Sequence, residues 1–391
     1  MTILIGEMEP NLTVDLANAI DNNVIVVTQI LSSYIYYKYR IKNKKCKIFL
    51  LNRHVRSKID LEDKCAREIF DKTVYFYKSL FKNHGFKDTD PSEEIRSIWG
   101  ELLNILNRFP ISSAVIWNVS SATNAYIDVY CKNNNIKRNI LENGFKRPFT
   151  ITLDYYGMNI ESGYLKLDSE ISRNDLYKTK NGVKTVNPRE YMFFRIFDML
   201  LPCGINRPFF SFRIKIKKIY RNILFKNKEK PNKNIHYEYD FLPLQLLDDS
   251  QNLFYSPYSS YKEVIEAALT VSSSEKLLVK IHPLDINREL CVEQIQPLLA
   301  CGKVIISENN TSELIRGAQR IICVNSTVGF EALTLGKEVY LLGSAMYENV
   351  HGIINRKTNR TFQEFLNRTQ VEFPINDYNE NDIKNLVSYI Q

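Results

Sequence analysis

The amino-acid sequence predicts an α/β protein built from two Rossmann-like domains, and three observations support this fold class. The chain has 391 residues, a length that suits two domains better than one small core. Short apolar, β-branched runs alternate with helix-like stretches in both halves, as in parallel sheets flanked by helices. The alternation breaks between residues 185 and 238, where the composition becomes strongly basic. We therefore expect two parallel sheets joined by a linker.

The first half of the chain opens with three predicted strands, each a short apolar run bounded by polar residues. These are "TILIGE", "NNVIVVTQ" and "KCKIFLLN". Helices are expected at about 12–20, 61–83 and 92–108, followed by the strand "SAVIWNVS", the helix "ATNAYIDVYCKNN" and the strand "IKRNILENGF". Residues 1–200 are therefore predicted to form an N-terminal Rossmann-like domain.

The second half of the chain repeats this alternation from residue 239 onward. The runs "YDFLPLQ", "KLLVKIHP", "KVIIS", "RIICVN" and "EVYLLG" are typical of strands, and helices are expected over "SYKEVIEAALTV", "NRELCVEQIQPLLA", 311–317 and 328–335. Residues 239–345 are therefore predicted to form a C-terminal Rossmann-like domain. Residues 346–391 contain two further helical stretches, which we expect to pack back on the first domain.

Residues 201–238 form the predicted basic linker between the two domains. Nine Lys or Arg residues and one Glu lie between Arg213 and Lys233, with Ile and Leu interleaved among them. This pattern is typical of an amphipathic arm on anionic lipid, and a solvated interdomain linker is the open alternative. The formal charge of +8 favours anionic partners, but no nucleic-acid-binding motif accompanies it, so we expect no nucleic-acid partner.

The sequence indicates a cytoplasmic protein without a bound cofactor or metal. No apolar run approaches the ~18 residues of a membrane-spanning helix, and the N-terminus lacks the regions of a signal peptide. The seven cysteines are scattered and form no CxxC pair, which argues against disulfides and structural zinc. The acidic triplet "DTD" at 88–90 precedes Pro91 and a predicted helix, so a helix N-cap explains it better than a metal site.

Four polar clusters directly follow predicted strands. Ligands of open α/β sheets collect at the carboxyl ends of the strands, so these clusters are the candidates for a functional site. They are Glu142-Asn143-Gly144 after "KRNIL", Gln245 through Ser250 after "FLPL", His282-Pro283 after "LLVKI", and Asn325-Ser326-Thr327 after "IICV".

The Asn325 to Thr327 triplet allows two interpretations. It precedes a predicted helix, and the first N–H groups of that helix, with the triplet's own hydroxyl and amide groups, could bind a phosphate. Ser326 or Thr327 could instead simply cap the helix, as residues of this type commonly do.

The titratable residues of the other clusters also allow both a structural and a chemical interpretation. His282 could be structural, or it could donate a hydrogen bond to a phosphoryl oxygen. Asp248 and Asp249 are adjacent, so in an extended chain they point in opposite directions and only one can enter a given pocket. Glu142 could be a surface turn residue, or a general acid or base if burial raises its pKa.

Five motifs between Glu142 and Tyr347 carry a resemblance to a known group of proteins. They are "ENGF" (142–145), "LDYYGMN" (153–159), "QLLDDS" (245–250), "KIHP" (280–283) and "NSTVGFEALTLGKEVYLLGSAMY" (325–347). With these motifs the sequence resembles bacterial β-Kdo glycosyltransferases of the capsule and O-antigen type, within the wider capsule polysaccharide biosynthesis family.

This resemblance implies a GT-B architecture, in which two Rossmann-like domains face each other across a cleft. Residues 1–200 would lie on the acceptor side, and the C-terminal domain would bind most of the donor. The implied enzyme transfers a CMP-activated keto sugar, Kdo, from CMP-Kdo to a bacterial surface polysaccharide or lipid-linked glycan. It would work at the inner face of the inner membrane, as a peripheral protein that contacts anionic lipid through residues 213–233. The single phosphate of CMP makes a divalent metal unnecessary.

The resemblance also implies roles for individual residues. Asp249 would be the nucleophile of a retaining double displacement through a glycosyl-enzyme, and Glu142 would be the acid/base, with Glu161 as a rival. His282 is counted among the catalytic residues as well as the donor contacts. The implied donor site comprises Gln245, Ser250, His282, Asn325, Ser326, Thr327 and Glu331, with Glu331 accepting hydrogen bonds from ribose hydroxyls.

Two other functions remain open at the level of the sequence. One is a sialyltransferase of GT-B fold that uses CMP-sialic acid, because such enzymes share an HP motif, a hydroxyl-rich phosphate site and an acidic-x-Gly motif. The other is a non-catalytic assembly factor that binds glycan or lipid through a decayed transferase fold and the basic arm.

Overall fold

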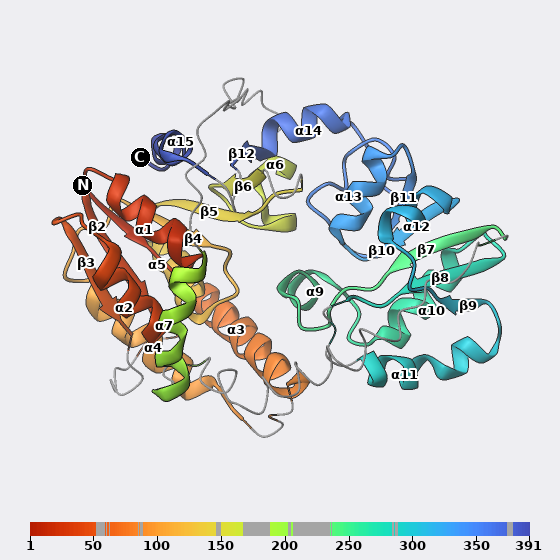
Figure 1. Cartoon of the computed structure of the whole chain (residues 1–391), viewed down its shortest axis with the longest axis horizontal. Helices are drawn as coiled ribbons and strands as arrows, with labels where there is room; N and C mark the ends of the chain where they lie inside the picture. The colour runs from red at the N-terminus through yellow and green to blue at the C-terminus, as the bar shows by residue number, and fades with distance from the viewer. Residues whose placement is uncertain are drawn as a thin grey trace. The chain divides into compact units, whose positions relative to one another are not determined.

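The computed structural model describes residues 1–51, 63–84, 89–145, 150–166, 188–201, 237–283, 288–373 and 378–391, together with residues 59, 61, 86, 205, 235 and 285. The described residues divide into two α/β units (Figure 1). The first unit contains the described residues up to Met158, the helix at 188–200 and the C-terminal residues from Thr369 onward. The second contains residues 159–166 and 237–368. The predicted basic arm at 213–233 lies outside the described residues.

The first unit is built on a seven-stranded sheet in the order β12-β6-β5-β4-β1-β2-β3. Strands β1 to β5 run parallel, whereas β6 pairs antiparallel to β5 and β12 pairs antiparallel to β6. The central strands are continuous apolar runs because helices cover both of their faces. The bounds are β1 (Thr2–Ile5), β2 (Asn23–Thr28), β3 (Cys46–Leu50), β4 (Ser113–Trp117), β5 (Lys137–Asn143), β6 (Thr150–Asp154) and β12 (Gln370–Glu372).

Local capping explains where several helices of the first unit begin. The side chains of Glu9, Asp63 and Ser121 accept hydrogen bonds from N–H groups in the first turns of α1, α3 and α5. At the start of α4, Asp90 of the "DTD" triplet accepts a hydrogen bond from the Ser92 N–H at 3.2 Å. The helices are α1 (Pro10–Ala19), α2 (Leu31–Arg40), α3 (Lys64–Asn83), α4 (Ser92–Leu106), α5 (Ala122–Asn133) and α7 (Pro188–Leu200).

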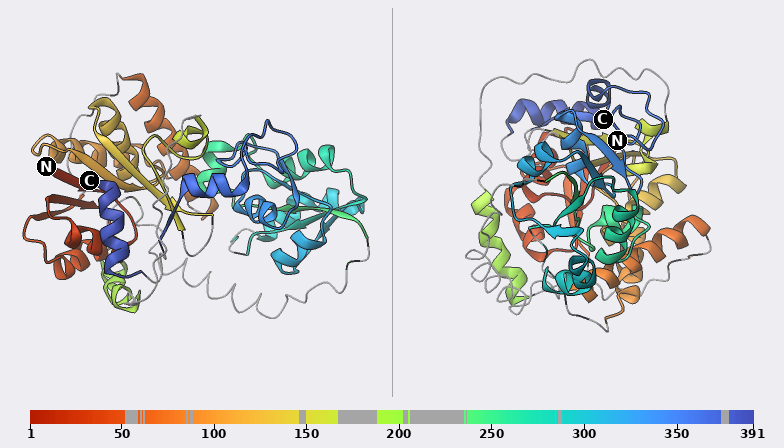
Figure 2. Two further views of the ribbon diagram at one scale, coloured as in Figure 1. Left: turned by 90° about the horizontal axis from the view of Figure 1, so that it is seen from above. Right: turned by 90° about the vertical axis from the view of Figure 1, so that its right-hand side faces the viewer.

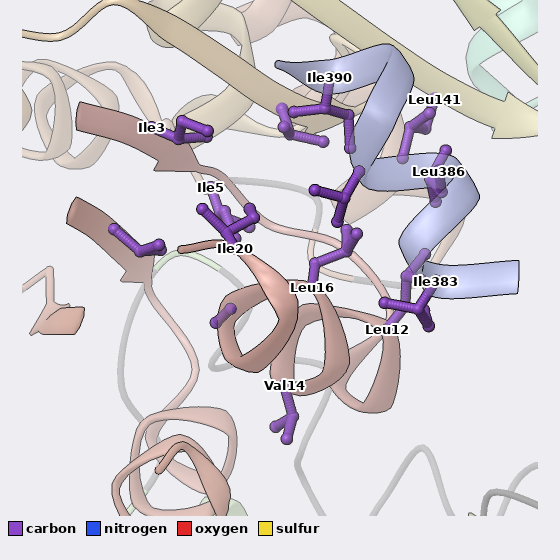
Figure 3. Close-up of a cluster of buried hydrophobic side chains, with 14 of the residues drawn as sticks. Ile3, Ile5, Leu12, Val14, Leu16, Ile20, Leu141, Ile383, Leu386 and Ile390 are labelled. Carbon is purple, nitrogen blue, oxygen red and sulfur yellow. The ribbon is translucent and has the colours of Figure 1, made fainter. Parts of the chain in front are cut away.

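The C-terminal helix α15 (Glu380–Ile390) completes the core of the first unit. Its apolar face packs on α1 and on the sheet, so residues from the two ends of the chain form one buried cluster (Figure 3). In this cluster Ile383 lies near Leu12 of α1, and Leu386 lies near Leu141 of β5. Both chain ends therefore lie in the first unit, close to each other (Figure 2).

The second unit is built on a five-stranded parallel sheet in the order β11-β10-β7-β8-β9. Its strands are β7 (Tyr239–Pro243), β8 (Lys276–Lys280), β9 (Val304–Ile306), β10 (Arg320–Cys323) and β11 (Glu338–Leu341). Its helices are α6 (Gly163–Lys166), α9 (Ser250–Tyr255), α10 (Tyr261–Val271), α11 (Arg288–Ala300), α12 (Thr311–Gly317), α13 (Thr327–Thr334) and α14 (Phe362–Thr369), with a 3-10 turn η1 (Asn159–Glu161). Each strand except β11 is followed by a helix that returns the chain to the sheet, which parallel pairing requires.

These two units confirm the predicted α/β class with two Rossmann-like sheets, the architecture expected of the GT-B class. The sheet of the first unit differs from the expectation at one edge, where β6 and β12 run antiparallel. The six cysteines in the described part of the chain are free thiols. Within that same part, none of the helices is both long and apolar enough to cross a membrane.

Candidate functional site at the strand ends of the second unit

The sheet of the second unit has a topological switch point between β7 and β10. From β7 the strand order runs to β8 and β9 on one side and to β10 and β11 on the other. Ligands of open α/β sheets bind beyond the carboxyl ends of the strands at such a point. Gln245 follows β7, Asn325 follows β10, and His282 follows the neighbouring strand β8. The topology therefore brings three of the four predicted clusters to one edge of the sheet.

Gln245 and Asn325 join the two strand ends directly. The Gln245 Nε2 donates to Asn325 Oδ1 at 2.9 Å, and the Asn325 N–H donates to Gln245 Oε1 at 3.3 Å. The Asn325 Nδ2 donates in turn to the carbonyl oxygen of Gln251 at 3.0 Å. Asn325 is buried, and both the oxygen and the nitrogen of its side-chain amide form hydrogen bonds within the protein. This amide positions the loops around the switch point.

Ser326 caps the helix that follows. Its Oγ accepts a hydrogen bond from the Val328 N–H at 3.2 Å, which confirms the capping interpretation of the triplet for this residue. The Ser326 carbonyl oxygen accepts a hydrogen bond from the hydroxyl of Tyr347, which is buried. Thr327 is half-buried and forms the first residue of α13. The helix N-terminus is therefore fixed in place at the strand-end edge of the sheet.

Gly329 allows α13 to pack closely against the sheet. A Cβ atom at this position would lie 2.5 Å from the Tyr347 hydroxyl oxygen and 2.7 Å from Cys323 Sγ. Such distances require backbone or side-chain shifts in a buried region. The close packing of α13 thus explains the glycine in "NSTVGFEALT" without any ligand.

His282 is half-buried beyond the end of β8, and the surrounding charges act on it in opposite directions. Burial lowers the pKa of the imidazole below its usual 6.5, while the carboxylates of Asp249, Asp285 and Asp248 favour the protonated form and oppose this shift. The net effect is a lowered pKa, so the ring is neutral at pH 7 and carries one N–H donor.

The turn that carries His282 is fixed by a buried carboxylate. Asp285 accepts a hydrogen bond from the Tyr261 hydroxyl, and its own N–H donates to the His282 carbonyl oxygen at 2.9 Å. Both Asp285 and Tyr261 are buried. The backbone carbonyl of His282 is therefore tied to the buried Asp285.

Asp249 is exposed and lies at the N-terminus of α9. Its Oδ1 accepts a hydrogen bond from the Gln251 N–H at 2.8 Å, and Ser250 is the first residue of the helix. Because the Gln251 carbonyl oxygen accepts from Asn325, this turn is tied to the switch point. Asp248 lies in the preceding turn, and its carboxylate, like that of Asp249, acts on the pKa of His282.

Glu331 lies on the exposed face of α13, four residues after Thr327. Its Oε1 accepts a hydrogen bond from the Ser312 hydroxyl of α12 at 2.9 Å. The carboxylate thus links α13 to the first turn of α12 and remains accessible to solvent. It can therefore accept a further hydrogen bond from a ligand hydroxyl.

The similarity of this chain to known proteins is consistent with this site. Residues 167–375, just over half of the 391-residue chain, match the family described as capsule polysaccharide biosynthesis protein. The chain belongs to the capsule polysaccharide biosynthesis family. The matched segment contains Gln245, Asp249, His282, the Asn325 to Thr327 triplet and Glu331.

Two curated relatives and one solved structure illustrate how far the similarity extends. Protein FixF of Sinorhizobium fredii is 34% identical over 30% of this chain and 29% of its own length. The capsule polysaccharide export protein KpsS of Escherichia coli is 25% identical over 36% of this chain and 40% of its own length. The β-Kdo 2,7-transferase KpsC of Thermosulfurimonas dismutans aligns over 76% of this chain and 90% of that structure, at 17% identity and a TM-score of 0.38. The chain thus spans less than half of the length of each of these two curated relatives.

The two acid/base candidates of this chain, Glu142 and Glu161, lie in different units. Glu142 was expected to follow a strand, but it lies within β5 of the first unit, opposite Thr152 of β6. The strand extends further because β5 and β6 form a hairpin, in which the Gly144 N–H donates to the Thr150 carbonyl oxygen at 2.9 Å. Glu161 lies in η1, which belongs to the second unit and contacts α9.

Asn159, which precedes Glu161 by two residues, was not among the predicted site residues. It is 4% exposed and has φ 48, in the left-handed region that Asn tolerates better than most residues. Its Nδ2 donates to the Ser344 carbonyl oxygen beyond β11 at 3.1 Å, whereas its buried Oδ1 has no hydrogen-bond partner within the described residues. A sequence signal was present, because Asn159 ends the "LDYYGMN" motif.

The first unit also has a switch point, between β1 and β4, but its polar groups are engaged with one another. Glu7 accepts from the Gln29 N–H at 2.8 Å, and the Gln29 Nε2 donates to the Thr123 hydroxyl at 2.7 Å. Asn124 donates to the Glu7 and Trp117 carbonyl oxygens. Burial raises the pKa of Glu7. These hydrogen bonds hold the strand ends together, so the cluster has a structural role.

Two further features bear on what the protein could bind. A cavity of about 820 Å³ lies along α1, α2 and α15 of the first unit, but its four cationic and four acidic side chains balance and none is a predicted site residue. Across the described ranges, no group of three or more His, Cys, Asp or Glu side chains is placed to hold a metal ion.

Proposed function

We propose that this chain is a glycosyltransferase that moves Kdo from CMP-Kdo to a bacterial surface polysaccharide or a lipid-linked glycan. The observation that carries the proposal is the strand-end site of the second unit. Gln245, Asn325 and the Ser326-capped α13 lie at the switch point, and His282 follows the neighbouring strand β8. Membership of the capsule polysaccharide biosynthesis family supports a role in making such a glycan. We place the activity at the inner face of the inner membrane.

In this proposal the phosphate of CMP binds at the N-terminus of α13. The Thr327 hydroxyl and the Thr327 N–H are the donors, because the helix terminus favours an anion and the next two N–H groups already bond to Ser326. Asn325 acts as a positioning residue, since its amide already holds Gln245 and Gln251. The neutral His282 ring donates its N–H to a phosphoryl oxygen and stabilises the charge that develops as CMP leaves. Glu331 accepts hydrogen bonds from the ribose hydroxyls.

The proposed chemistry is a double displacement at the anomeric carbon of Kdo. A carboxylate oxygen of Asp249 attacks this carbon while the bond to the phosphate oxygen breaks, and the bonding electrons leave with CMP. The acceptor hydroxyl then attacks the same carbon, its proton passes to the acid/base, and the Asp249 carboxylate is released. Two inversions retain the configuration. The hydrogen bond from the Gln251 N–H orients the attacking carboxylate.

The acid/base in this scheme is Glu142, on the basis of its "ENGF" motif, and Glu161 is the residue to compare with it. Glu161 shares a unit with Asp249, whereas Glu142 belongs to the first unit. Transfer that survives Glu161→Gln and is lost with Glu142→Gln would support the assignment, and the opposite result would exchange the two residues.

The deciding experiment is mass spectrometry of the protein after incubation with CMP-Kdo in the absence of an acceptor. A Kdo-sized adduct on the peptide that contains Asp249 is expected, and Asp249→Asn should remove it and lower transfer about a thousandfold or more. Asp248→Asn is the matched control, because it changes the same charge one residue earlier and should keep the adduct. The proposal includes no metal step, so a chelator should leave transfer unchanged.

Three outcomes would contradict this proposal in different ways. Transfer from CMP-sialic acid but not from CMP-Kdo would replace the donor. Transfer that persists in Asp249→Asn would remove the covalent step. Absence of any protection by CMP against thermal unfolding would favour a non-catalytic assembly factor.

A further inference from the structure

Helix α7 of the first unit carries an exposed apolar face. The residues on this face, with Leu201 directly after the helix, are large, apolar and between 55% and 78% exposed, and we call them the α7 stripe: Met192, Phe193, Ile196, Leu200 and Leu201. The spacing of Phe193, Ile196 and Leu200 is i, i+3, i+7, which places them on one side of a helix. Apolar side chains of this size gathered on one exposed face mark an interaction surface.

The opposite face of α7 is locked to α2, so the helix cannot rotate to bury the stripe. The buried Asp198 carboxylate accepts from the Ser32 N–H at 2.9 Å and from its hydroxyl. The Tyr191 hydroxyl lies within hydrogen-bond distance of the hydroxyls of Ser32 and Ser33. Figure 1 shows α7 lying beside α2 in the first unit.

A group of exposed cations lies beside one end of the stripe. The C-terminal end of α2 and the loop after it carry five exposed Lys or Arg side chains, and we call them the α2 basic cluster: Lys38, Arg40, Lys42, Lys44 and Lys45. Three of them, Arg40, Lys42 and Lys45, also line the cavity with its four acidic side chains, whereas Lys38 and Lys44 do not. The helices are antiparallel, because Ser32 contacts Asp198 while Arg40 pairs with Glu190 at 3.4 Å. The cluster is therefore next to the Met192 and Phe193 end of the stripe.

An aromatic contact joins the α2 basic cluster to the partly buried side of α7. Tyr39, which is 67% exposed and lies between two members of the cluster, has its ring 5.9 Å from that of Phe194 on α7. Tyrosine is favoured where an apolar region meets a charged, hydrated one. The stripe, Tyr39 and the cluster thus lie on two helices of the first unit that pack against each other.

We propose that the α7 stripe and the α2 basic cluster together form a docking surface for an anionic lipid bilayer. The apolar side chains enter the boundary between headgroups and acyl chains, and the lysines pair with anionic headgroups, as in interfacial amphipathic helices. Charge complementarity selects this occupant over a second copy of the chain, because two copies would bring like-charged clusters together and lysine is depleted in protein interfaces.

The surface is distinct from the predicted basic arm and from the strand-end site. It lies on described residues of the first unit, whereas Gln245, His282 and Asn325 belong to the second. Vesicle binding needs no sugar transfer, so its result is independent of the proposed function. A surface of this kind would bring the enzyme to a glycan acceptor that is itself held at a membrane.

The test is flotation of the full chain with vesicles of phosphatidylglycerol and phosphatidylethanolamine, compared with neutral phosphatidylcholine vesicles. The protein should float with the anionic vesicles and be released from them at about 0.5 M salt. The double variant F193S/I196S should lower partitioning at least about tenfold, because two apolar side chains no longer enter the bilayer. The double variant K42E/K44E should weaken binding to the anionic vesicles only.

Matched controls separate docking from a general loss of fold or of surface apolarity. The double variant L290S/I354S removes two exposed apolar side chains of the second unit and should float like the parent protein. Flotation of F193S/I196S equal to that of the parent would overturn the proposal. So would a concentration-dependent dimer that F193S/I196S dissociates, because the stripe would then be a contact between copies.

Discussion

At the scale of single residues, His282 shows how burial sets the chemistry of the site. Its pKa lies below 6.5 in the folded protein, mainly because of desolvation. In the unfolded chain the ring titrates near its ordinary value of about 6.5. The unfolded chain therefore binds the proton more readily, and protonation costs stability as the pH falls from about 6.5 toward the folded pKa. An anion bound beside the ring would reverse this effect.

The titration of His282 is accordingly expected to depend on CMP. In the free protein its NMR titration midpoint should lie below about 6.5, and CMP should raise it, because the phosphate favours the imidazolium form. The signal is assigned by comparison with His282→Gln, which should also bind CMP more weakly. A midpoint that CMP leaves unchanged would place the phosphate away from this ring.

At the scale of secondary-structure elements, α13 shows how a short helix is held in place by its contacts with the rest of the unit. The helix has only eight residues, so its placement depends on the Ser326 cap, the Tyr347 hydrogen bond and the close approach at Gly329. These contacts set the direction of the N–H groups that would meet a ligand. Small changes at the base of the helix should therefore act on stability and on ligand binding together.

Gly329→Ala tests this packing. The added methyl group should meet the Tyr347 hydroxyl and Cys323, and should lower the free energy of unfolding by about 1–3 kcal/mol. Urea denaturation gives the value. Removing the hydroxyl with Tyr347→Phe should reduce the penalty of the alanine, measured as a double-mutant cycle. Strictly additive effects would show that the hydroxyl is not the obstacle.

The sequence predicted most elements of both units but not the interactions that link distant ones. Alternating apolar runs depend on neighbouring residues only, and they located the parallel strands and most of the helices of both units. The pairing of Gln245 with Asn325 spans 80 residues, yet the rule for strand ends drew attention to both. The contact between Ser32 and Asp198 spans 166 residues and left no local signal.

The antiparallel edge of the first sheet was missed for a related physical reason. Strand β12 has three residues, and its pairing with β6 is decided by tertiary contacts that no local pattern records. The same edge explains why Glu142 lies in a strand and not in a turn. Asp249 was predicted as a nucleophile, and its capping of α9 was overlooked although the "DDS" sequence carries a cap signal.

At the scale of the whole molecule, the first unit is made from three separate stretches of the chain, which alternate with those of the second unit. Residues from Thr369 onward add an edge strand and α15 to the sheet and core formed by the first 158 residues. The buried face of α15 packs into the same apolar cluster as β1, β2 and α1. The stability of the first unit therefore depends on its last helix.

Leu386→Ala is expected to weaken the first unit selectively. Leu386 is 1% exposed, so its truncation leaves a cavity and should cost about 2–5 kcal/mol. Hydrogen exchange should increase in peptides from β1 and β4 and stay unchanged in peptides from β8, whose core is separate. Lys384→Ala, on the exposed face of the same helix, is the control. Equal increases in both units would contradict this division of stability.

The position of α15 also has a consequence for how the protein is synthesised. A ribosome releases the whole of the second unit before it releases the residues that close the core of the first. Domains generally fold as units while the chain emerges, so the second unit can fold while the first still exposes the apolar groove that α15 will fill. During that interval the nascent first unit is the part of the molecule most in need of a chaperone.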